Sequence, residues 1–471
     1  MMQLLPEGDN VTSRPRLHHR KWRRMRKLIL YLSLLTFPAL AWAQQSLSLP
    51  DAVRLALREN KSLAAAGADD RASGQKTAEA RSGMLPKVNY SETWARGDNP
   101  VFVFGSLLTQ HQFAMDNFQI GPLNRPGFLN DFQSQVTVDQ PLYDAGMTRN
   151  AVKTAQLSQQ ITGEELRRAQ MEVMAGVVRA YYGAMLAEAA LRTAEQSVQS
   201  AEADLRQAES VHQAGMSTDA DVLSIRVHLA AVSEQRIQSA ADLDVARAAL
   251  NDALGLPLDT PHTLTTSLEP IVSPPATLAD LEPGAVQQRP EARESRLALA
   301  IAQARADSAR NAFQPTVGFH GAFEADRQRF LDRGGANWLA SVSLRWNLFD
   351  GFADKRRVAE SAEWIARARA DRERTDSAVR LQLRRAHAAL DSADQRIEVA
   401  KAAAAAAQES LRITRNRYEA GMSNVTDLLR NETALLESRT RYLAAVHDQR
   451  IAATMLELAA GRLTPDSEVL K

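Results

Sequence analysis

An internal repeat constrains this 471-residue chain more than any other feature of its sequence. Two short motifs recur at an offset of 206 residues: Tyr143-Asp144-Ala145 with Phe349-Asp350-Gly351, and Ala214-Gly215-Met216-Ser217 with Ala420-Gly421-Met422-Ser423. Upstream, Leu85-Pro86-Lys87-Val88 corresponds to Gln314-Pro315-Thr316-Val317 at an offset of 229. A fixed offset predicts two copies of one structural unit. The first copy holds 23 additional residues at about Asn99 to Asn130, which are rich in Gly, Pro, Asn and Phe and predict a loop.

A long helical pattern follows the Asp motif in each copy. In the second copy ten apolar positions recur at spacings of four and three residues: Val379, Leu383, Ala386, Leu390, Ala393, Ile397, Ala400, Ala404, Ala407 and Leu411. Their counterparts 206 residues earlier are apolar as well: Val173, Val177, Ala180, Ala184, Ala187, Leu191, Ala194, Val198, Ala201 and Leu205. A sustained 3.5-residue period predicts a left-handed supercoiled seam. Because no proline lies between residues 144 and 213, one helix of about 100 Å is expected there.

Each long helix is followed by a glycine and a second helical stretch, which predicts a helical hairpin in each copy. Gly215 and Gly421 suit the left-handed position just past a helix end, and Ser217 and Ser423 are expected to cap the returning helices. Further helical stretches are expected at about 50–84 and 284–312. The predicted organisation begins with a leader over 1–43, places a connector over 255–283 and ends with a tail over 462–471. The first repeat covers 44–254 and consists of a strand-loop-strand at 86–143, a long helix at 144–213 and a return helix at 218–253. The second repeat covers 284–461 and consists of a strand-loop-strand at 315–349, a long helix at 350–420 and a return helix at 424–460.

The segments that flank each loop alternate between apolar and polar residues. In 338–348 the apolar positions are Trp338, Ala340, Val342, Leu344, Trp346 and Leu348, and 132–142 has the same two-residue period. The weaker segments 87–95 and 315–324 place Val88, Tyr90, Trp94, Val317, Phe319 and Phe323 on one face. Such strands fit a transmembrane barrel or an amphipathic sheet packed on the helices. If they enter a membrane, four strands cannot close alone, so the chain has to form an oligomer that shares one barrel.

The N-terminus predicts export. Met25-Arg26-Lys27 is basic, Leu28 to Leu40 is apolar, and Ala41-Trp42-Ala43 is a cleavage signal, which together indicate a signal peptide cleaved after Ala43. The alternative is a retained membrane anchor, and residues 1–24 are either a long leader or an upstream start that is not used. Removing 1–43, with its eight Lys/Arg and two Asp/Glu, changes the net charge from +1 to −5, so no nucleic-acid partner is expected. The chain has no cysteine, which excludes disulfides, thiolate metal sites and a lipidated N-terminal Cys.

Taken together, these motifs resemble the TolC family of outer-membrane efflux proteins over about residues 46–461. The resemblance implies a mainly α fold with a small β part, in which long coiled-coil hairpins form a periplasmic α-barrel and four strands per chain join a shared 12-stranded trimeric β-barrel. It implies a homotrimer in outer-membrane lipid, extending into the periplasm, with a periplasmic adaptor and an inner-membrane transporter of RND, ABC or MFS type as partners. The implied function is passive conduction of drugs, toxic small molecules, metals or secreted proteins, without a cofactor or a catalytic site.

The resemblance also assigns candidate site residues. The hairpin tips that would bind the adaptor comprise Gly215, Met216, Ser217, Leu223, Gly421, Met422, Ser423 and Leu429. Asp221 and Asp427 match aspartates at the channel entrance, although an acid in a first helical turn is also favoured by the helix dipole alone. The family's best-known entrance carries another acid where this chain has Arg430, which argues against a cation-binding acidic ring. The strand-to-helix junctions are expected at Tyr143, Asp144, Gly146, Phe349, Asp350 and Gly351.

Two other protein classes, a periplasmic adaptor and a helix-bundle enzyme, share some of these sequence features. A periplasmic adaptor would show one hairpin flanked by small β domains, whereas this chain repeats the hairpin. A di-iron helix-bundle enzyme needs Glu-x-x-His on two helices, and only Glu209-x-x-His212 has that spacing. No phosphate-binding loop, dinucleotide-binding turn or nucleophile elbow is present. The sequence therefore predicts a gated duct, opened when partners at the tips separate the hairpins along their alanine-rich seams.

Overall fold

The computed structural model describes residues 45–272 and 277–471. Strand β1 (Gln45–Leu47) pairs with β4 (His262–Leu264) in a small two-stranded sheet. Residues 47–260 and 264–471 form one large unit, whereas residues 45–46 and 261–263 are grouped apart from it. The predicted signal peptide and its cleavage site after Ala43 lie outside the described residues, and both stay predictions.

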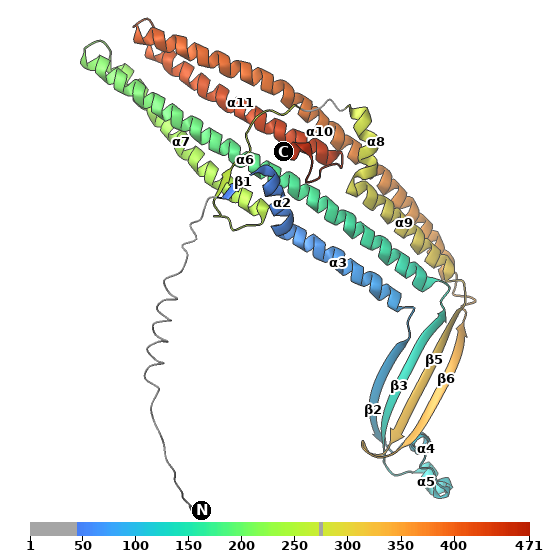
Figure 1. The fold of residues 1–471 in the computed structure, drawn as a ribbon. Coiled ribbons are helices and arrows are strands. Elements are labelled where there is room, and N and C mark those ends of the chain that lie inside the picture. Colours follow the sequence, from blue (N-terminus) through green and yellow to red (C-terminus); the bar gives the residue numbers. More distant parts are fainter. Residues whose placement is uncertain (1–44, 273–276) are drawn as a thin grey trace, which may run out of the picture. The chain divides into compact units, whose positions relative to one another are not determined.

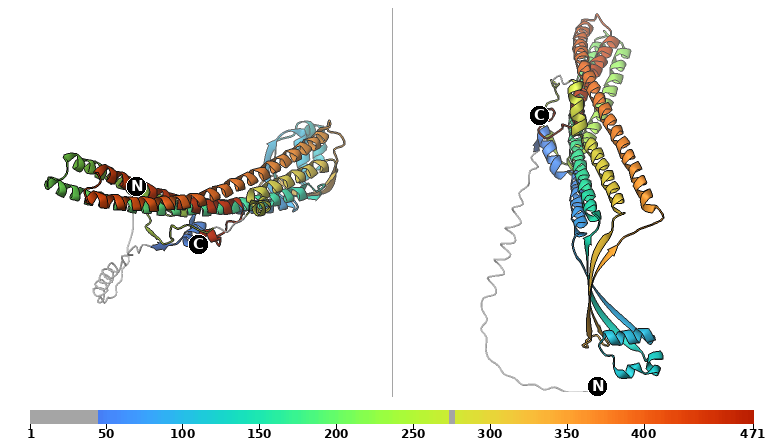
Figure 2. Two further views of the ribbon diagram at one scale, coloured as in Figure 1. Left: turned by 90° about the horizontal axis from the view of Figure 1, so that it is seen from above. Right: turned by 90° about the vertical axis from the view of Figure 1, so that its right-hand side faces the viewer.

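Two long helical hairpins dominate the large unit (Figure 1). The first consists of α6 (Met147–Gln213) and α7 (Asp219–Leu254), and the second of α10 (Ala353–Glu419) and α11 (Val425–Ala459). Helices α6 and α10 have 67 residues each, which corresponds to about 100 Å. The two helices of each hairpin pack along one another, and α11 also packs against α6, as both views of Figure 2 show.

The seam positions explain why these helices pair. All ten apolar positions of the 3.5-residue pattern in α10 are buried or half-buried, and so are all ten in α6. Alanine fills many of them, so the helix axes can approach closely. The predicted heptad seam is therefore confirmed in both copies.

Shorter helices flank the long ones, and here the expected boundaries need correction. The stretch expected at 50–84 is divided into α2 (Leu49–Glu59) and α3 (Lys61–Ser82), because the Asn60 side chain accepts a hydrogen bond from the Ser62 N–H at 2.9 Å and caps α3. The stretch expected at 284–312 becomes α8 (Leu278–Gln288) and α9 (Pro290–Asn311). Pro290 holds Arg289 in an extended conformation (φ −62°, ψ 135°), which ends α8.

Four antiparallel strands form a sheet in the order β2-β3-β5-β6, beyond the ends of α3, α6, α9 and α10 (Figure 1). They are β2 (Lys87–Gly97), β3 (Leu129–Tyr143), β5 (Thr316–Arg327) and β6 (Gly335–Arg345). One cross-strand row joins Tyr90, Val136, Phe323 and Trp338, and the next row joins Ser91, Gln135, Glu324 and Asn337. Because neighbouring rows face opposite ways, the sheet has one apolar and one polar face. Trp338, Val342 and Leu344 on the apolar face are exposed, so this face of the sheet does not pack on the helices.

The residues inserted between β2 and β3, predicted as a loop, contain α4 (Pro100–Thr109), the 3₁₀ helix η1 (Met115–Phe118) and α5 (Ile120–Asn124). Asn99 caps α4 by accepting hydrogen bonds from the Val101 and Phe102 N–H groups at 3.0 and 3.3 Å, and Pro100 occupies the first helical position. The prediction missed α4 because its short apolar run shows no helical period. None of the helices in the described part of the chain combines the length and hydropathy needed to cross a bilayer.

Candidate functional site

The two hairpin tips have the same backbone conformation. Gly215 and Gly421 have φ angles of +74° and +71°, the left-handed region that favours glycine. Their N–H groups donate to the carbonyls of His212 and Tyr418 at 2.8 and 2.9 Å, which closes the ends of α6 and α10. The next residues, Met216 and Met422, are 74% and 65% exposed. Each tip therefore presents a flexible apolar side chain to solvent.

The returning helices are capped one residue later than expected. Thr218 and Asn424, not Ser217 and Ser423, are the N-caps of α7 and α11. Asp221 completes a capping box, since its carboxylate accepts from the Thr218 N–H at 3.1 Å and its own N–H donates to the Thr218 hydroxyl at 3.3 Å. Ser and Thr are adjacent in the sequence, so residue type alone did not distinguish the cap.

At the second tip the candidate gate residues interact with each other. The Arg430 guanidinium lies 3.7 Å from the Asp427 carboxylate, and both side chains are largely exposed. The Asp427 N–H donates to the Asn424 side chain at 2.8 Å. Arg430 thus places a cation beside the acid that the resemblance assigns to the entrance.

An apolar cluster joins the two tips. Its buried residues are Ala208, Val222, Ile225 and Val425, and Leu205, Tyr418 and Leu429 pack against them. Leu429 therefore takes part in contacts between the hairpins, whereas Leu223 is 56% exposed. Among the predicted tip residues, Gly215 and Gly421 are exposed, and Met216, Met422 and Leu223 present exposed apolar side chains to a partner.

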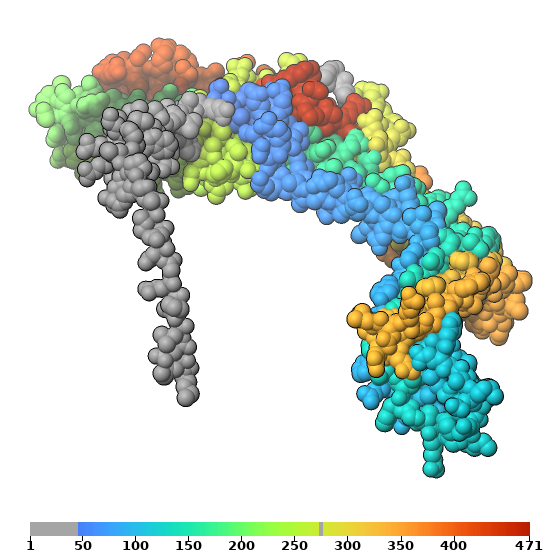
Figure 3. Space-filling model, turned by 60° about the horizontal axis from the view of Figure 1, so that its bottom comes forward, coloured from blue at the N-terminus to red at the C-terminus, as the bar shows by residue number. Residues whose placement is uncertain are grey.

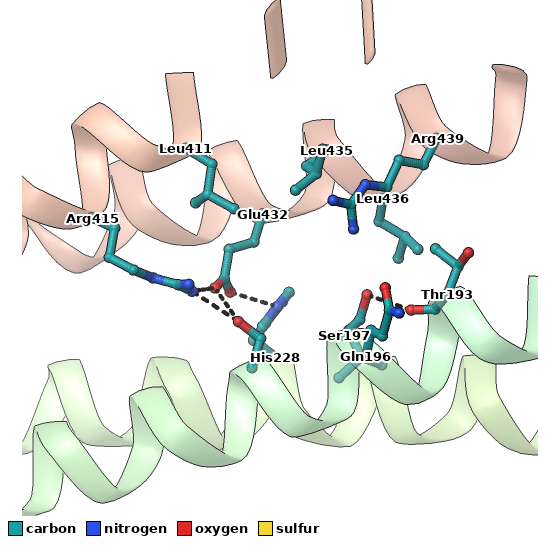
Figure 4. Close-up of a pocket in the computed structure, with 12 residues that line it drawn as sticks. Thr193, Gln196, Ser197, His228, Leu411, Arg415, Glu432, Leu435, Leu436 and Arg439 are labelled. Carbon is teal, nitrogen blue, oxygen red and sulfur yellow. Dashed lines mark hydrogen bonds and ion pairs between the residues drawn. The ribbon is translucent and has the colours of Figure 1, made fainter. Parts of the chain in front are cut away.

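A polar network also connects the hairpins, farther along the helices from the tips (Figure 4). Arg415 and Glu432 extend from α10 and α11 toward α6 and α7, and their side chains form an ion pair. Arg415 also lies 3.1 Å from the Asp204 carboxylate, and His228 lies 3.2 Å from that of Glu432. The network lies beside a cavity of about 220 Å³ whose lining includes Ser200 and Val232.

The two carboxyl groups of this network, Asp204 and Glu432, differ in their pKa values. Burial and the neighbouring Glu432 carboxylate raise the pKa of Asp204 to about 7. Burial acts against ionisation of Glu432 as well, but hydrogen bonds from His228 and Asp204 and the charge of Arg415 hold its pKa below the usual value. At acid pH a proton on this pair of carboxylates is therefore favoured on Asp204 over Glu432, and it is released as the pH rises through about 7. No sequence pattern reveals this network, because its four members lie on four different helices, far apart in the chain.

The strand-to-helix junctions are built around the two predicted aspartates. The Asp144 carboxylate accepts from the Gly146 and Thr148 N–H groups at 2.9 and 2.6 Å, and that of Asp350 accepts from the Asp354 N–H at 2.7 Å. Gly146 and Gly351 have φ angles of +77° and +70°. Tyr143 donates to the Gln314 side chain at 2.6 Å, whereas Phe349 packs edge-on against Phe352. These contacts turn each chain from the sheet into a long helix.

The repeat, the two hairpins and the two-faced sheet agree with one known family. The family model described as outer membrane efflux protein matches residues 52–256 and 283–462. The chain belongs to the outer membrane efflux protein family. It is 28% identical to Protein CyaE of Bordetella pertussis over 72% of this chain and 73% of that protein. It is 23% identical to the alkaline protease secretion protein AprF of Pseudomonas aeruginosa over 89% of this chain and 85% of that protein. The crystal structure of the Campylobacter jejuni CmeC outer membrane channel has the same fold, with a TM-score of 0.75 at 16% identity over 89% of this chain and 87% of that one.

Outer membrane efflux proteins are channels, not enzymes, so the channel function predicted from the sequence is confirmed. Members of the family are trimers that reach from the outer membrane into the periplasm and work with inner-membrane pumps and adaptors. The adaptor alternative is not favoured. Glu209 and His212 have other partners than a metal: Glu209 pairs with Arg226 at 2.8 Å, and His212 contacts the Ser217 carbonyl at 3.1 Å.

Proposed function

We propose that three copies of this chain form one twelve-stranded barrel in the outer membrane. The observation that carries this proposal is the four-stranded sheet, which has one apolar face, one polar face and two edge strands, β2 and β6, without a partner strand among the described residues. An open sheet edge is not tolerated in lipid. Pairing of β6 with β2 of the next copy gives the backbone groups of both edge strands hydrogen-bond partners. It also puts the apolar face toward lipid and the polar face toward the bore.

The hairpins then extend from the barrel as a periplasmic tube that ends at the tips. We propose that a periplasmic adaptor binds Met216, Met422 and Leu223, which are exposed and apolar. The tube opens when the hairpins separate along their alanine-rich seams, and the energy comes from the inner-membrane pump. The tip cluster around Ile225 and the ion pairs Arg415–Asp204 and His228–Glu432 are the contacts that must break between the two hairpins of one chain.

The mature chain is proposed to begin at Gln44 after removal of the signal peptide. A secreted protein is the cargo to test first, because AprF, which aligns with 89% of this chain, is named for the secretion of a protease. Drugs, toxic small molecules and metals are the other cargo classes.

Assembly is tested by isolating outer membranes from cells that express the chain. We expect a detergent-resistant trimer that dissociates on heating, with an N-terminal sequence starting at Gln44. A monomer in the soluble periplasmic fraction would contradict the proposal.

Gating is tested in the double variant Met216→Cys/Met422→Cys, which contains the only cysteines of the chain. Linking the tips with a short bis-methanethiosulfonate, which forms a disulfide with each cysteine and releases sulfinate, is expected to abolish export, and reduction of these disulfides should restore it. Full export while the linker is intact would exclude opening at the tips.

A further inference from the structure

The segment inserted between β2 and β3, residues 98–128, is anchored to the polar face of the sheet through Thr109 and Gln110. The Gln110 side chain, which is 2% exposed, donates to the Asp131 carboxylate at 2.8 Å and to the Asn130 carbonyl at 3.0 Å. On β6, the Asn337 side chain donates to the Thr109 carbonyl at 3.0 Å. Asp131 alternates with Gln133 and Gln135 along β3, and Asn337 is in the polar cross-strand row, so both anchors belong to the face that lines the proposed bore.

The backbone itself is in close contact at this anchor. A Cβ atom on Gly335 would lie 1.9 Å from the Thr109 carbonyl oxygen and 2.9 Å from the Gln110 carbonyl carbon. Only glycine allows the end of α4 to approach β6 so closely. The position of α4 over the polar face is therefore specified by the strand and not only by side chains.

The rest of the inserted segment carries apolar side chains without a covering partner in the described chain. Val101, Met115 and Ile120 are 82%, 81% and 78% exposed, and Phe118 and Phe128 are also exposed. Figure 3 shows the segment projecting past the end of the sheet. An apolar surface of this kind marks an interface. Lipid does not suit it, because the segment is anchored on the face opposite to Trp338 and Phe323.

The dimensions of the proposed barrel identify the partner. Twelve strands at a spacing of about 4.8 Å and a tilt of about 40° give a barrel roughly 24 Å across. An α-helix with its side chains is about 10–12 Å wide. Three helices around a three-fold axis therefore fill such a mouth, and each would contact the other two.

From these observations we propose that the inserted segments of three copies meet at the three-fold axis and close the outer mouth of the barrel through Val101, Met115, Ile120 and their neighbours. The partner of this surface is a second copy of the same chain. The inference rests on the trimer proposed above. It adds a gate at the cell surface, at the opposite end of the duct from the tips.

The anchor also shows a feature expected of a gate that opens. Asp326 on β5 is fully buried in the same region, and neither of its carboxylate oxygens has hydrogen-bond geometry with any described residue. Burying an unpaired carboxylate costs free energy. The conformation in which Asp326 is buried is therefore less stable than one in which its carboxylate is hydrogen-bonded.

Single cysteines test the proposal, since the natural chain has none. In a three-fold assembly, identical positions form a disulfide only near the axis, because the Cα atoms must lie about 4.4–6.8 Å apart. Val101→Cys, Met115→Cys and Ile120→Cys are examined in intact cells after mild oxidation. We expect a covalent dimer from at least one of them. Leu331→Cys, an equally exposed apolar position in the β5–β6 connection, is the control and should give none.

A second measurement is the conductance of purified trimers in lipid bilayers. The triple variant Val101→Ser/Met115→Ser/Ile120→Ser is expected to conduct severalfold more than the wild type, and Gln110→Ala, which removes the anchor to Asp131, should have the same effect. An intact trimer without dimers and with unchanged conductance would overturn the surface gate but leave the trimeric duct standing. If the cysteine variants form no covalent dimer and react only with a lipid-soluble maleimide, the segment lies in lipid, and this result would also overturn the gate. Loss of the trimer itself in unheated gels of wild-type membranes would overturn both proposals.

Discussion

Asp221 and Asp427 occupy corresponding positions at the two tips but make different contacts. Asp221 satisfies backbone and side-chain donors of Thr218, whereas Asp427 is paired with Arg430. One carboxylate closes a helix end and the other is neutralised by a cation one turn later. These contacts support the helix-terminal explanation for Asp221, whereas an acidic, cation-binding ring would need Asp427 without its arginine.

The capping residue of α7 gives a prediction at this scale. Thr218→Ala should destabilise the tip by about 1 kcal/mol, because the first-turn N–H groups lose their acceptor. Ser217→Ala is the matched control: the buried Ser217 hydroxyl has no hydrogen-bond partner among the described residues, so its removal should be neutral or slightly stabilising. Amide hydrogen exchange at residues 219–223 measures the difference. Equal exchange rates in the two variants would contradict the assignment of the cap.

The protonation of Asp204 predicts a pH dependence. Its pKa in the folded protein, about 7, lies above the ordinary value of 3.8. The folded state therefore binds the extra proton between these values, and stability contributed by the network is lost as the pH rises through about 7. Asp204→Asn keeps a neutral, hydrogen-bonding side chain. It should remove this loss and raise the melting temperature of the trimer most above pH 7, with a smaller increase near pH 5, where only part of the stability has been lost.

Melting curves of the wild type and Asp204→Asn from pH 5 to pH 8.5 provide the test. Glu432 does not interfere in this range, because its lowered pKa affects stability only at more acid pH. An identical fall in melting temperature in both proteins would show that Asp204 is not the titrating group.

Some helices and turns could be predicted from the sequence, and others could not. The heptad seams were predictable because twenty positions in two copies repeat one period, and all of them are buried or half-buried. The hairpin turns were predictable because glycine is needed at a positive φ. The breaks at Asn60 and Arg289 and the helix at 100–109 were missed, since each depends on one local cap or proline within an ambiguous pattern. The Asp204–Arg415–Glu432–His228 network required knowledge of which helix faces meet, which no single periodicity supplies.

A comparison of Gly255 and Gly215 distinguishes two costs of replacing a helix-terminal glycine by alanine, backbone strain at positive φ and steric overlap of the new Cβ atom. Gly255, after α7, has a φ of +79°, and a Cβ there would lie 2.6 Å from the Glu59 carbonyl oxygen. Gly215 has a similar φ of +74° but no atom within 4 Å of its Cβ position. Gly215→Ala should cost only about 1–2 kcal/mol of backbone strain. Gly255→Ala should cost clearly more, because α7 must also move away from the α2–α3 junction.

Thermal unfolding of the two glycine variants measures this difference. Gly255→Ala is expected to give the lower melting temperature and a smaller yield of trimer. Equal destabilisation would mean that the contact between Gly255 and Glu59 does not restrict the fold.

For the whole molecule, the orientation of the sheet in the membrane is the central expectation. Val342 and Ser341 are neighbours on β6, but the register puts Val342 on the apolar face and Ser341 on the polar face. Arginine on the lipid-facing side of a barrel costs about 2–4 kcal/mol near the bilayer midplane. Val342→Arg should therefore sharply reduce the trimer recovered from outer membranes, and the matched variant Ser341→Arg should assemble normally. The opposite result would reverse the assignment of the two faces.

The two unpartnered strands β2 and β6 have a further consequence for the biogenesis of the protein. A single chain in transit through the periplasm exposes backbone donors and acceptors on both sides of its sheet, together with Trp338, Val342 and Leu344. Such a species is prone to wrong pairing with other chains. The sheet is therefore expected to acquire its final structure only as subunits associate at the membrane, so the lifetime of the free monomer, and the chaperones that shield it, should limit how much channel a cell can make.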